Sequence, residues 1–145
     1  MLVYFVGLIV LFIADRVSKF YFVNKTPEAL GGFIDLHLNQ ELAFSLPVVD
    51  YVLYPLVFIV IFVVVKFWLE AYKSKNILIW PWGLLVVGAI SNLLDRFKYG
   101  GVVDFINVPF FTVFNISDIY ISIAVIWILW YEVIYKKKKL DKNFT

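Results

Sequence analysis

The sequence predicts an all-α membrane protein, a bundle of four transmembrane helices with a small sheet and a covering loop on its outer side. Of the 145 residues, 63% are hydrophobic, and the mean hydropathy is +0.88. A soluble domain of this size could not bury so much apolar surface, so the surrounding solvent must be largely lipid. Aromatic residues make up 20% of the chain, as expected where Trp and Tyr lie at membrane interfaces. We expect one integral membrane domain, residues 1–145.

Four segments are long and apolar enough to be transmembrane helices, at about residues 2–23, 51–69, 77–95 and 118–135. A spanning helix needs about 20 mostly apolar residues, and flanking side chains that reach the interface extend a shorter stretch. Pro55 and Pro81 are compatible with this assignment because membrane helices tolerate proline.

The distribution of basic residues predicts the orientation of the four segments. Three lysines lie in the 66–76 connection and five in the tail after the fourth segment, whereas the two other connections together carry Lys25, Arg96 and Lys98. Loops rich in Lys and Arg stay in the cytoplasm, so both termini are expected there. A basic tail after an apolar span is read as a cytoplasmic anchor, and no nucleic-acid partner is expected.

Polar residues of the apolar segments gather at the ends that this orientation places outside. They are Asp15, Arg16, Lys19, Asn92, Asp95, Arg96 and Asp118, and Asp104 lies in an outer connection. Charged groups are costly within a membrane, so their convergence at one depth favours a functional site at the outer face.

The outer connections predict a small sheet. Residues 34–39, IDLHLN, alternate apolar and polar side chains after the turn signal Gly31-Gly32, which is typical of a strand. The segments VVDFI and VPFFTVF suit extended structure, but Pro109 argues against a regular strand through its position. His37 and Glu41 are interpreted as polar residues on the wet face of this sheet.

Two helical patterns bring polar groups together. Gly88, Asn92, Asp95 and Arg96 share one helix face, where they either line a site or act as helix–helix contacts with a charge pair at the end. Asp15 and Lys19 form an i, i+4 pair in the favourable order. That pair is either a structural ion pair, or Lys19 keeps Asp15 ionised while Asp15 orients part of a site.

Asp104 and Asp118 are the candidates for acid–base chemistry. Two close carboxylates do not both ionise readily, so one can act as a general acid while the other activates water. Taken singly, they could be a solvated loop acid and an ordinary acid at a helix start. Asn115 or Ser117 is expected to cap the fourth helix.

No metal or cofactor is expected. The sequence has no cysteine, and its single histidine and scattered carboxylates do not form a recognisable metal cluster.

Five short motifs, in order, resemble the lipoprotein signal peptidase (signal peptidase II) family. Asp15 and Lys19 match its Asp-x-x-x-Lys, and NQELAF at 39–44 is similar to its Asn-x-Gly-x-Ala-Phe. GAISNLLDR at 88–96 is similar to Gly-Ala-x-Gly-Asn-x-x-Asp-Arg, VVDFI at 102–106 matches closely, and FNISD at 114–118 is similar to Phe-Asn-x-Ala-Asp. Each motif is weak alone, but together they cover almost the whole chain.

This resemblance implies a four-helix bundle of the bacterial inner membrane with an extracytoplasmic β-cradle and an outer loop helix over the site. It implies an aspartic endopeptidase that cuts prolipoproteins just before a diacylglyceryl cysteine, with globomycin-type peptides as inhibitors. We expect a monomer in contact with membrane lipid. By the same resemblance, the catalytic residues are Asp104 and Asp118, the substrate-binding residues are Asn39, Asn92, Arg96 and Asn115, and the supporting residues are Asp15, Lys19 and Asp95.

The chain departs from the family pattern at three positions. Glu41 and Ser91 stand where the family has Gly, and Ser117 stands where it has Ala. Two other functions stay open: a small proton-coupled carrier, which would need polar residues continuing toward the cytoplasm, and a catalytically inactive relative.

Overall fold

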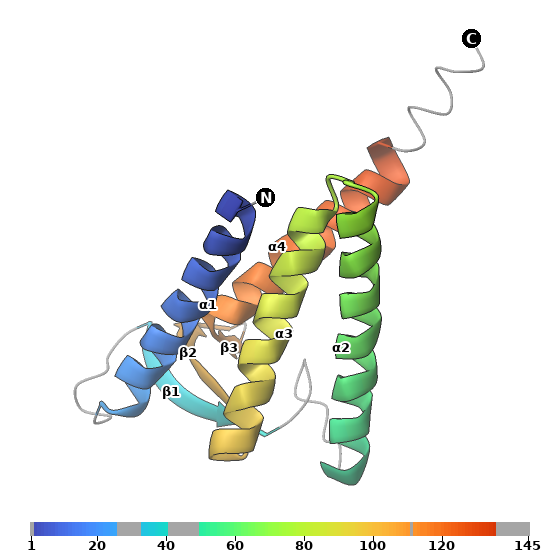
Figure 1. The fold of residues 1–145 in the computed structure, drawn as a ribbon. Helices are drawn as coiled ribbons and strands as arrows, with labels where there is room; N and C mark the ends of the chain where they lie inside the picture. The colour runs from blue at the N-terminus through green and yellow to red at the C-terminus, as the bar shows by residue number, and fades with distance from the viewer. Residues whose placement is uncertain (1, 26–32, 41–49, 111, 136–145) are drawn as a thin grey trace.

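The computed structural model describes residues 2–25, 33–40, 50–110 and 112–135, and helices dominate them (Figure 1). The elements in order are α1 (Leu2–Val23), β1 (Ile34–Asn39), α2 (Asp50–Lys73), α3 (Ile79–Tyr99), β2 (Val102–Val108), β3 (Thr112–Phe114), α4 (Ile116–Leu129) and a π-helical turn, η3 (Trp130–Tyr135). A helix therefore lies at each predicted segment. Helix α2 runs four residues farther than predicted, and α3 begins two residues later.

Two of the helical stretches, Tyr51–Lys73 and Ile116–Val133, are apolar and long enough to cross a membrane. Helices α1 and α3 carry charged residues, among them Asp15, Lys19 and Asp95, which interrupt their apolar runs. The count of four spans therefore stays a prediction. The described parts of the α1–α2 and α3–α4 connections contain no helix, so the expected loop helix stays a prediction, and Glu41 lies outside the described residues.

The two ends of the bundle differ in structure. The first turn of α1, the α2–α3 connection and η3 lie at one end, and the sheet lies beside the helices toward the other (Figure 1). Near the first end the core is aromatic and apolar. Trp68 Nε1 donates to the Tyr4 hydroxyl at 2.6 Å, and that hydroxyl donates to the Ile79 carbonyl at 2.8 Å. These bonds join α1, α2 and α3 at the end away from the predicted site.

The three-stranded antiparallel sheet has the order β1-β2-β3. Strand β1 coincides with the predicted strand at 34–39. Strand β2 ends at Val108, directly before Pro109, because proline lacks the N–H that the ladder needs. The ring of Phe105 stacks on that of Phe22 with 4.3 Å between centroids, which fixes β2 against α1. Asp104 is thereby held at the middle of the sheet, against the bundle.

Helices α3 and α4 approach closely at Gly88. A Cβ at this position would lie 2.7 Å from Ile121 Cγ1 and 2.9 Å from the Ser117 carbonyl oxygen. The isoleucine side chain can rotate, but the carbonyl belongs to the first turn of α4. The small residue therefore determines how near α4 lies to Asn92, one turn farther along α3.

Gly88→Ala should lower the thermal stability of the protein, because α3 and α4 must separate to admit the methyl group. Overpacking of this kind costs about 1–3 kcal/mol. Gly7→Ala is the matched control, since a Cβ there meets nothing within 4 Å. Melting curves of both variants in the same detergent test the contact, and equal melting temperatures would show that the helices are not tightly apposed at Gly88.

Candidate active site

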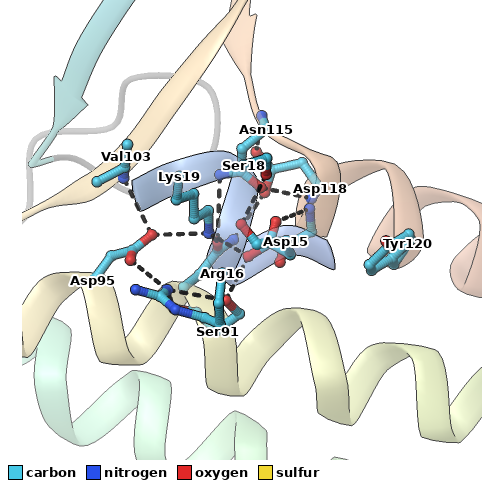
Figure 2. Close-up of polar contacts among 12 residues, drawn as sticks. Asp15, Arg16, Ser18, Lys19, Ser91, Asp95, Val103, Asn115, Asp118 and Tyr120 are labelled. Carbon is cyan, nitrogen blue, oxygen red and sulfur yellow. Dashed lines mark hydrogen bonds and ion pairs between the residues drawn. The ribbon is translucent and has the colours of Figure 1, made fainter. Parts of the chain in front are cut away.

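The predicted polar residues meet where α1, α3, β2 and the start of α4 come together (Figure 2). The side chains of Asp15, Lys19 and Asp95 are fully buried, and Asp104 and Asn115 are 2% and 0% exposed. Buried charges are costly unless they are paired, so the contacts of each group decide what the cluster can do.

Asp118 is held by the N-terminal cap of α4. The Asn115 side-chain oxygen accepts from the Asp118 N–H at 3.1 Å, and Asp118 Oδ2 accepts from the Asn115 N–H at 3.1 Å. This reciprocal capping box satisfies two N–H groups at the helix start. The sequence allowed either Asn115 or Ser117 to cap this helix, and the structure shows that Asn115 is the cap. The Ser117 hydroxyl is buried and has no hydrogen-bond partner among the described residues.

Asp104 accepts one amide hydrogen bond on each carboxylate oxygen. Asn115 Nδ2 donates to Oδ1 at 2.6 Å, and Asn39 Nδ2 donates to Oδ2 at 3.1 Å. Burial, and then the negative charge of Asp118, raise the pKa of Asp104 from 3.8 to about 6. Asn115 thus contacts both acids, and the two carboxyl groups are electrostatically coupled.

The orientation of the Asn92 side chain follows from its neighbours. Lys19 can only donate, so the oxygen of Asn92 must face it, and this bond is 2.7 Å long. The Asn92 amide nitrogen then points to Asp118 Oδ1 at 2.9 Å. Asn115 Nδ2 also donates to the Asn92 oxygen at 3.3 Å. The side-chain N–H groups of Asn92 and Asn115 therefore face the carboxylates of Asp118 and Asp104, respectively.

A second layer of charged side chains, Asp15, Lys19 and Asp95, supports this arrangement. Lys19 Nζ lies 3.1 Å from Asp15 Oδ2 and 2.8 Å from Asp95 Oδ2. With Asn92 as its third acceptor, the ammonium group uses all three of its donors. The predicted Asp15–Lys19 ion pair is thus present, and Lys19 joins it to Asp95 on α3.

Asn39 and Arg96 lie toward the sheet side of the cluster. Asn39 contacts Asp104, whereas Arg96 Nη1 donates to the carbonyl oxygen of Gln40, the residue after Asn39, at 3.4 Å. Among the described residues, no group of three or more His, Asp or Glu side chains is arranged to hold a metal ion.

Three residues have contacts at the site that the sequence did not predict. Arg16 of α1 contacts Ser91 and Asp95 of α3. Helical spacing could not predict these contacts, because it relates residues of one helix only. His37 pairs with Asp104 across β1 and β2, so both side chains lie on the same face of the sheet. Knowledge of the strand register would have placed His37 beside Asp104. The sequence alone placed His37 only on the solvent-exposed face of the sheet.

The raised pKa of Asp104 predicts a pH-dependent stability. The folded chain holds this proton more tightly than the unfolded chain, so stability is lost as the pH rises from 3.8 through about 6. Asp104→Asn removes this dependence, worth up to about 3 kcal/mol. The melting temperature of the variant minus that of the wild type should therefore increase from about pH 4 to about pH 7. A constant difference would contradict the raised pKa.

Comparison with known proteins identifies the family of this chain. Residues 7–134 match the signal peptidase (SPase) II family. The lipoprotein signal peptidase of Sulfurovum sp. (strain NBC37-1) is 38% identical over 130 residues, 82% of this chain and 84% of that protein. The lipoprotein signal peptidase of Sulfurimonas denitrificans is 37% identical over 141 residues, 93% of this chain and 88% of that protein.

Solved structures of bacterial membrane enzymes, determined by the in meso method, have the same fold. One is 25% identical with a TM-score of 0.76 and covers 92% of this chain and 94% of its own. Another is 24% identical with a TM-score of 0.74, and the match covers 89% of this chain and 86% of the other. Because the family match covers residues 7–134 and the two relatives are 38% and 37% identical over most of the chain, this chain belongs to the signal peptidase II family.

Proposed function

We propose that this protein is an aspartic endopeptidase that removes the signal peptide of prolipoproteins, with Asp104 and Asp118 as its catalytic pair. Membership of the signal peptidase II family supports the protease activity and the substrate class. The observation that carries the catalytic assignment is the double contact of Asn115, whose side chain donates to Asp104 while capping the turn that bears Asp118. One side chain thereby fixes two acids from different elements.

The pair can cleave a peptide bond without a covalent enzyme intermediate. The first acid, which is ionised, takes a proton from a water molecule while the water oxygen attacks the carbonyl carbon of the substrate. The second acid, which is protonated, donates its proton to the carbonyl oxygen. The resulting tetrahedral diol then collapses: the second acid takes a proton back from one diol hydroxyl as the carboxyl product forms, and the proton held by the first acid passes to the nitrogen of the leaving amine as the C–N bond breaks. Asn92 and Asn115 support this chemistry because their N–H groups keep both carboxylates oriented.

The substrate is expected to meet this site at the outer surface of the bacterial inner membrane. All four helices would span the membrane as one domain, residues 1–145, with both termini in the cytoplasm. Lys73 and Lys75, at the end of the bundle away from the sheet, support this orientation. The diacylglyceryl chains would anchor the scissile bond at the depth of the acids. Asn39 and Arg96 are proposed to bind substrate, and globomycin-type peptides would compete with it.

A proton-coupled carrier is not favoured. Such a protein needs polar groups that continue from the acid cluster across the membrane. In the described part of the chain, the buried cluster toward the opposite end consists of Tyr4, Leu8, Ala71, Leu78, Ile79 and Val87. Its one buried polar group, the Tyr4 hydroxyl, is engaged by Trp68 and the Ile79 carbonyl.

Purified protein should cleave a synthetic prolipoprotein peptide that carries a diacylglyceryl cysteine, at the bond just before that cysteine. The matched control is the same peptide with an unmodified cysteine, which should stay intact. Mass spectrometry of the products locates the bond. Failure of the folded protein to cut the lipidated peptide, or equal cutting of both peptides, would contradict the proposed function.

A further inference from the structure

The side chain of Arg16 lies against Asp95 and Ser91, at the edge of the buried group formed by Asp15, Lys19 and Asp95 (Figure 2). Its Nη1 atom lies 2.5 Å from Asp95 Oδ1, and it also donates to the Ser91 hydroxyl and the Ser91 carbonyl, both at 3.1 Å. The Arg16 side chain is 22% exposed, whereas that of Asp95 is fully buried. Arg16 is thus the only partly exposed member of this otherwise buried ion group within the described residues.

Ser91 connects Arg16 to the second supporting acid. Arginine can only donate, so the Ser91 hydroxyl accepts from Arg16, and its own hydrogen is donated to Asp15 Oδ2 at 2.5 Å. Ser91 is fully buried. A glycine, the residue of the family pattern at this position, would have no hydroxyl and could not make this bridge.

The charges also require Arg16. Asp15, Lys19 and Asp95 are buried together, and two acids with one lysine leave one uncompensated negative charge. An unpaired buried charge is strongly destabilising. Arg16 supplies the balancing positive charge through its contact with Asp95.

Each supporting acid holds the backbone directly before one catalytic acid. Asp15 Oδ1 accepts from the N–H of Ser117 at 2.8 Å, and Ser117 precedes Asp118. Asp95 Oδ2 accepts from the N–H of Val103 at 3.3 Å, and Val103 precedes Asp104. The two acids that Arg16 joins are therefore the two that fix the backbone of the catalytic pair.

We propose that Arg16 and Ser91 form a positioning pair that sets the separation of Asp104 and Asp118. Arg16 holds Asp95, and with it the β2 side of the site. Through Ser91 it also holds Asp15, and with it the first turn of α4. This proposal rests on the proposed function, since it assigns a role in the placement of the catalytic acids.

The test measures kcat, KM and melting temperature for the full-length protein on the diacylated peptide. Arg16→Met should lower kcat about tenfold or more and leave KM within about twofold, because a displacement of reacting groups by about 1 Å costs up to about 100-fold. Ser91→Ala should lower kcat by a smaller factor. The double variant should be no slower than Arg16→Met, because both changes break the same connection. Arg16→Lys, which keeps the charge, should recover part of kcat.

Two control variants separate positioning from general effects. Lys98→Met removes an exposed positive charge from the same end of α3, and Ser74→Ala removes a hydroxyl that binds the Glu70 carbonyl at the opposite end of the bundle. Both should keep the wild-type kcat. Ser117→Ala, which removes a buried hydroxyl that has no hydrogen-bond partner in the described part of the chain, should raise the melting temperature, whereas Ser91→Ala should lower it.

The outcomes distinguish this proposal from the proposed function. Wild-type protein that cleaves, combined with an unchanged kcat in Arg16→Met, would overturn the positioning pair alone. Independent, multiplicative losses in the double variant would also overturn it. If Arg16→Met does not fold, Ser91→Gly decides, because it breaks the bridge with the residue of the family pattern. A folded Ser91→Gly protein with wild-type kcat would refute the bridge.

Discussion

Asp104→Asn and Asp118→Asn should each abolish cleavage of the diacylated peptide while the protein stays folded. An asparagine can neither take a proton from the attacking water nor deliver one to the carbonyl oxygen, and the remaining acid cannot perform both roles. A single general acid or base contributes about 10²–10⁴-fold to the rate. The loss is expected to be larger here, because the two acids share one proton and neither can complete the reaction without the other. The measurement is kcat on the purified variants, with circular dichroism to establish the fold.

Asp35→Asn is the matched control for these two variants. Asp35 is an exposed acid on β1, in the same sheet as Asp104, and it has no place in the catalytic arrangement. It should keep wild-type activity. Substantial activity in either Asp104→Asn or Asp118→Asn would show that the two acids do not form the catalytic pair, even if the protein remains a prolipoprotein peptidase.

Local patterns in the sequence predicted the helices and strands well. Apolar runs located the four helices, the alternation at 34–39 located β1, and Pro109 marked the end of β2. These signals depend on neighbouring residues, which is why they can be read from a single chain. The start of α4 was less certain, because Asn115 and Ser117 can both cap a helix and only the folded backbone shows which one does.

The contacts between elements could not be predicted in the same way. Helical spacing showed that Asp15 can reach Lys19, but it carries no information about Asp95, which is 76 residues farther along and on another helix. Arg16 follows Asp15 directly and so points away from it on a helix face, and its role appears only when α3 packs against α1. Likewise, the position of His37 opposite Asp104 depends on strand register. Such long-range pairs are set by tertiary packing.

The largest effect on stability is expected for Lys19→Met. The lysine side chain is fully buried and donates to two acids and Asn92. Methionine fills a similar volume but leaves Asp15 and Asp95 without this partner. Removing one partner from a buried ion group costs about 3–5 kcal/mol, a large part of the stability of a small domain. Thermal unfolding in detergent should therefore show a much lower melting temperature, or no folded protein.

Two further variants identify the unpaired acids as the cause. Lys25→Met, which removes an exposed lysine just after the same helix, should change stability by no more than about 0.5 kcal/mol. Lys19→Met combined with Asp15→Asn should be more stable than Lys19→Met alone, because the remaining acid, Asp95, keeps Arg16 as its partner and no buried carboxylate then lacks one. A double variant as unstable as the single one would mean that Lys19 acts mainly through its bond to Asn92. In that case the lysine would serve the catalytic asparagine contacts more than the packing of α1 against α3.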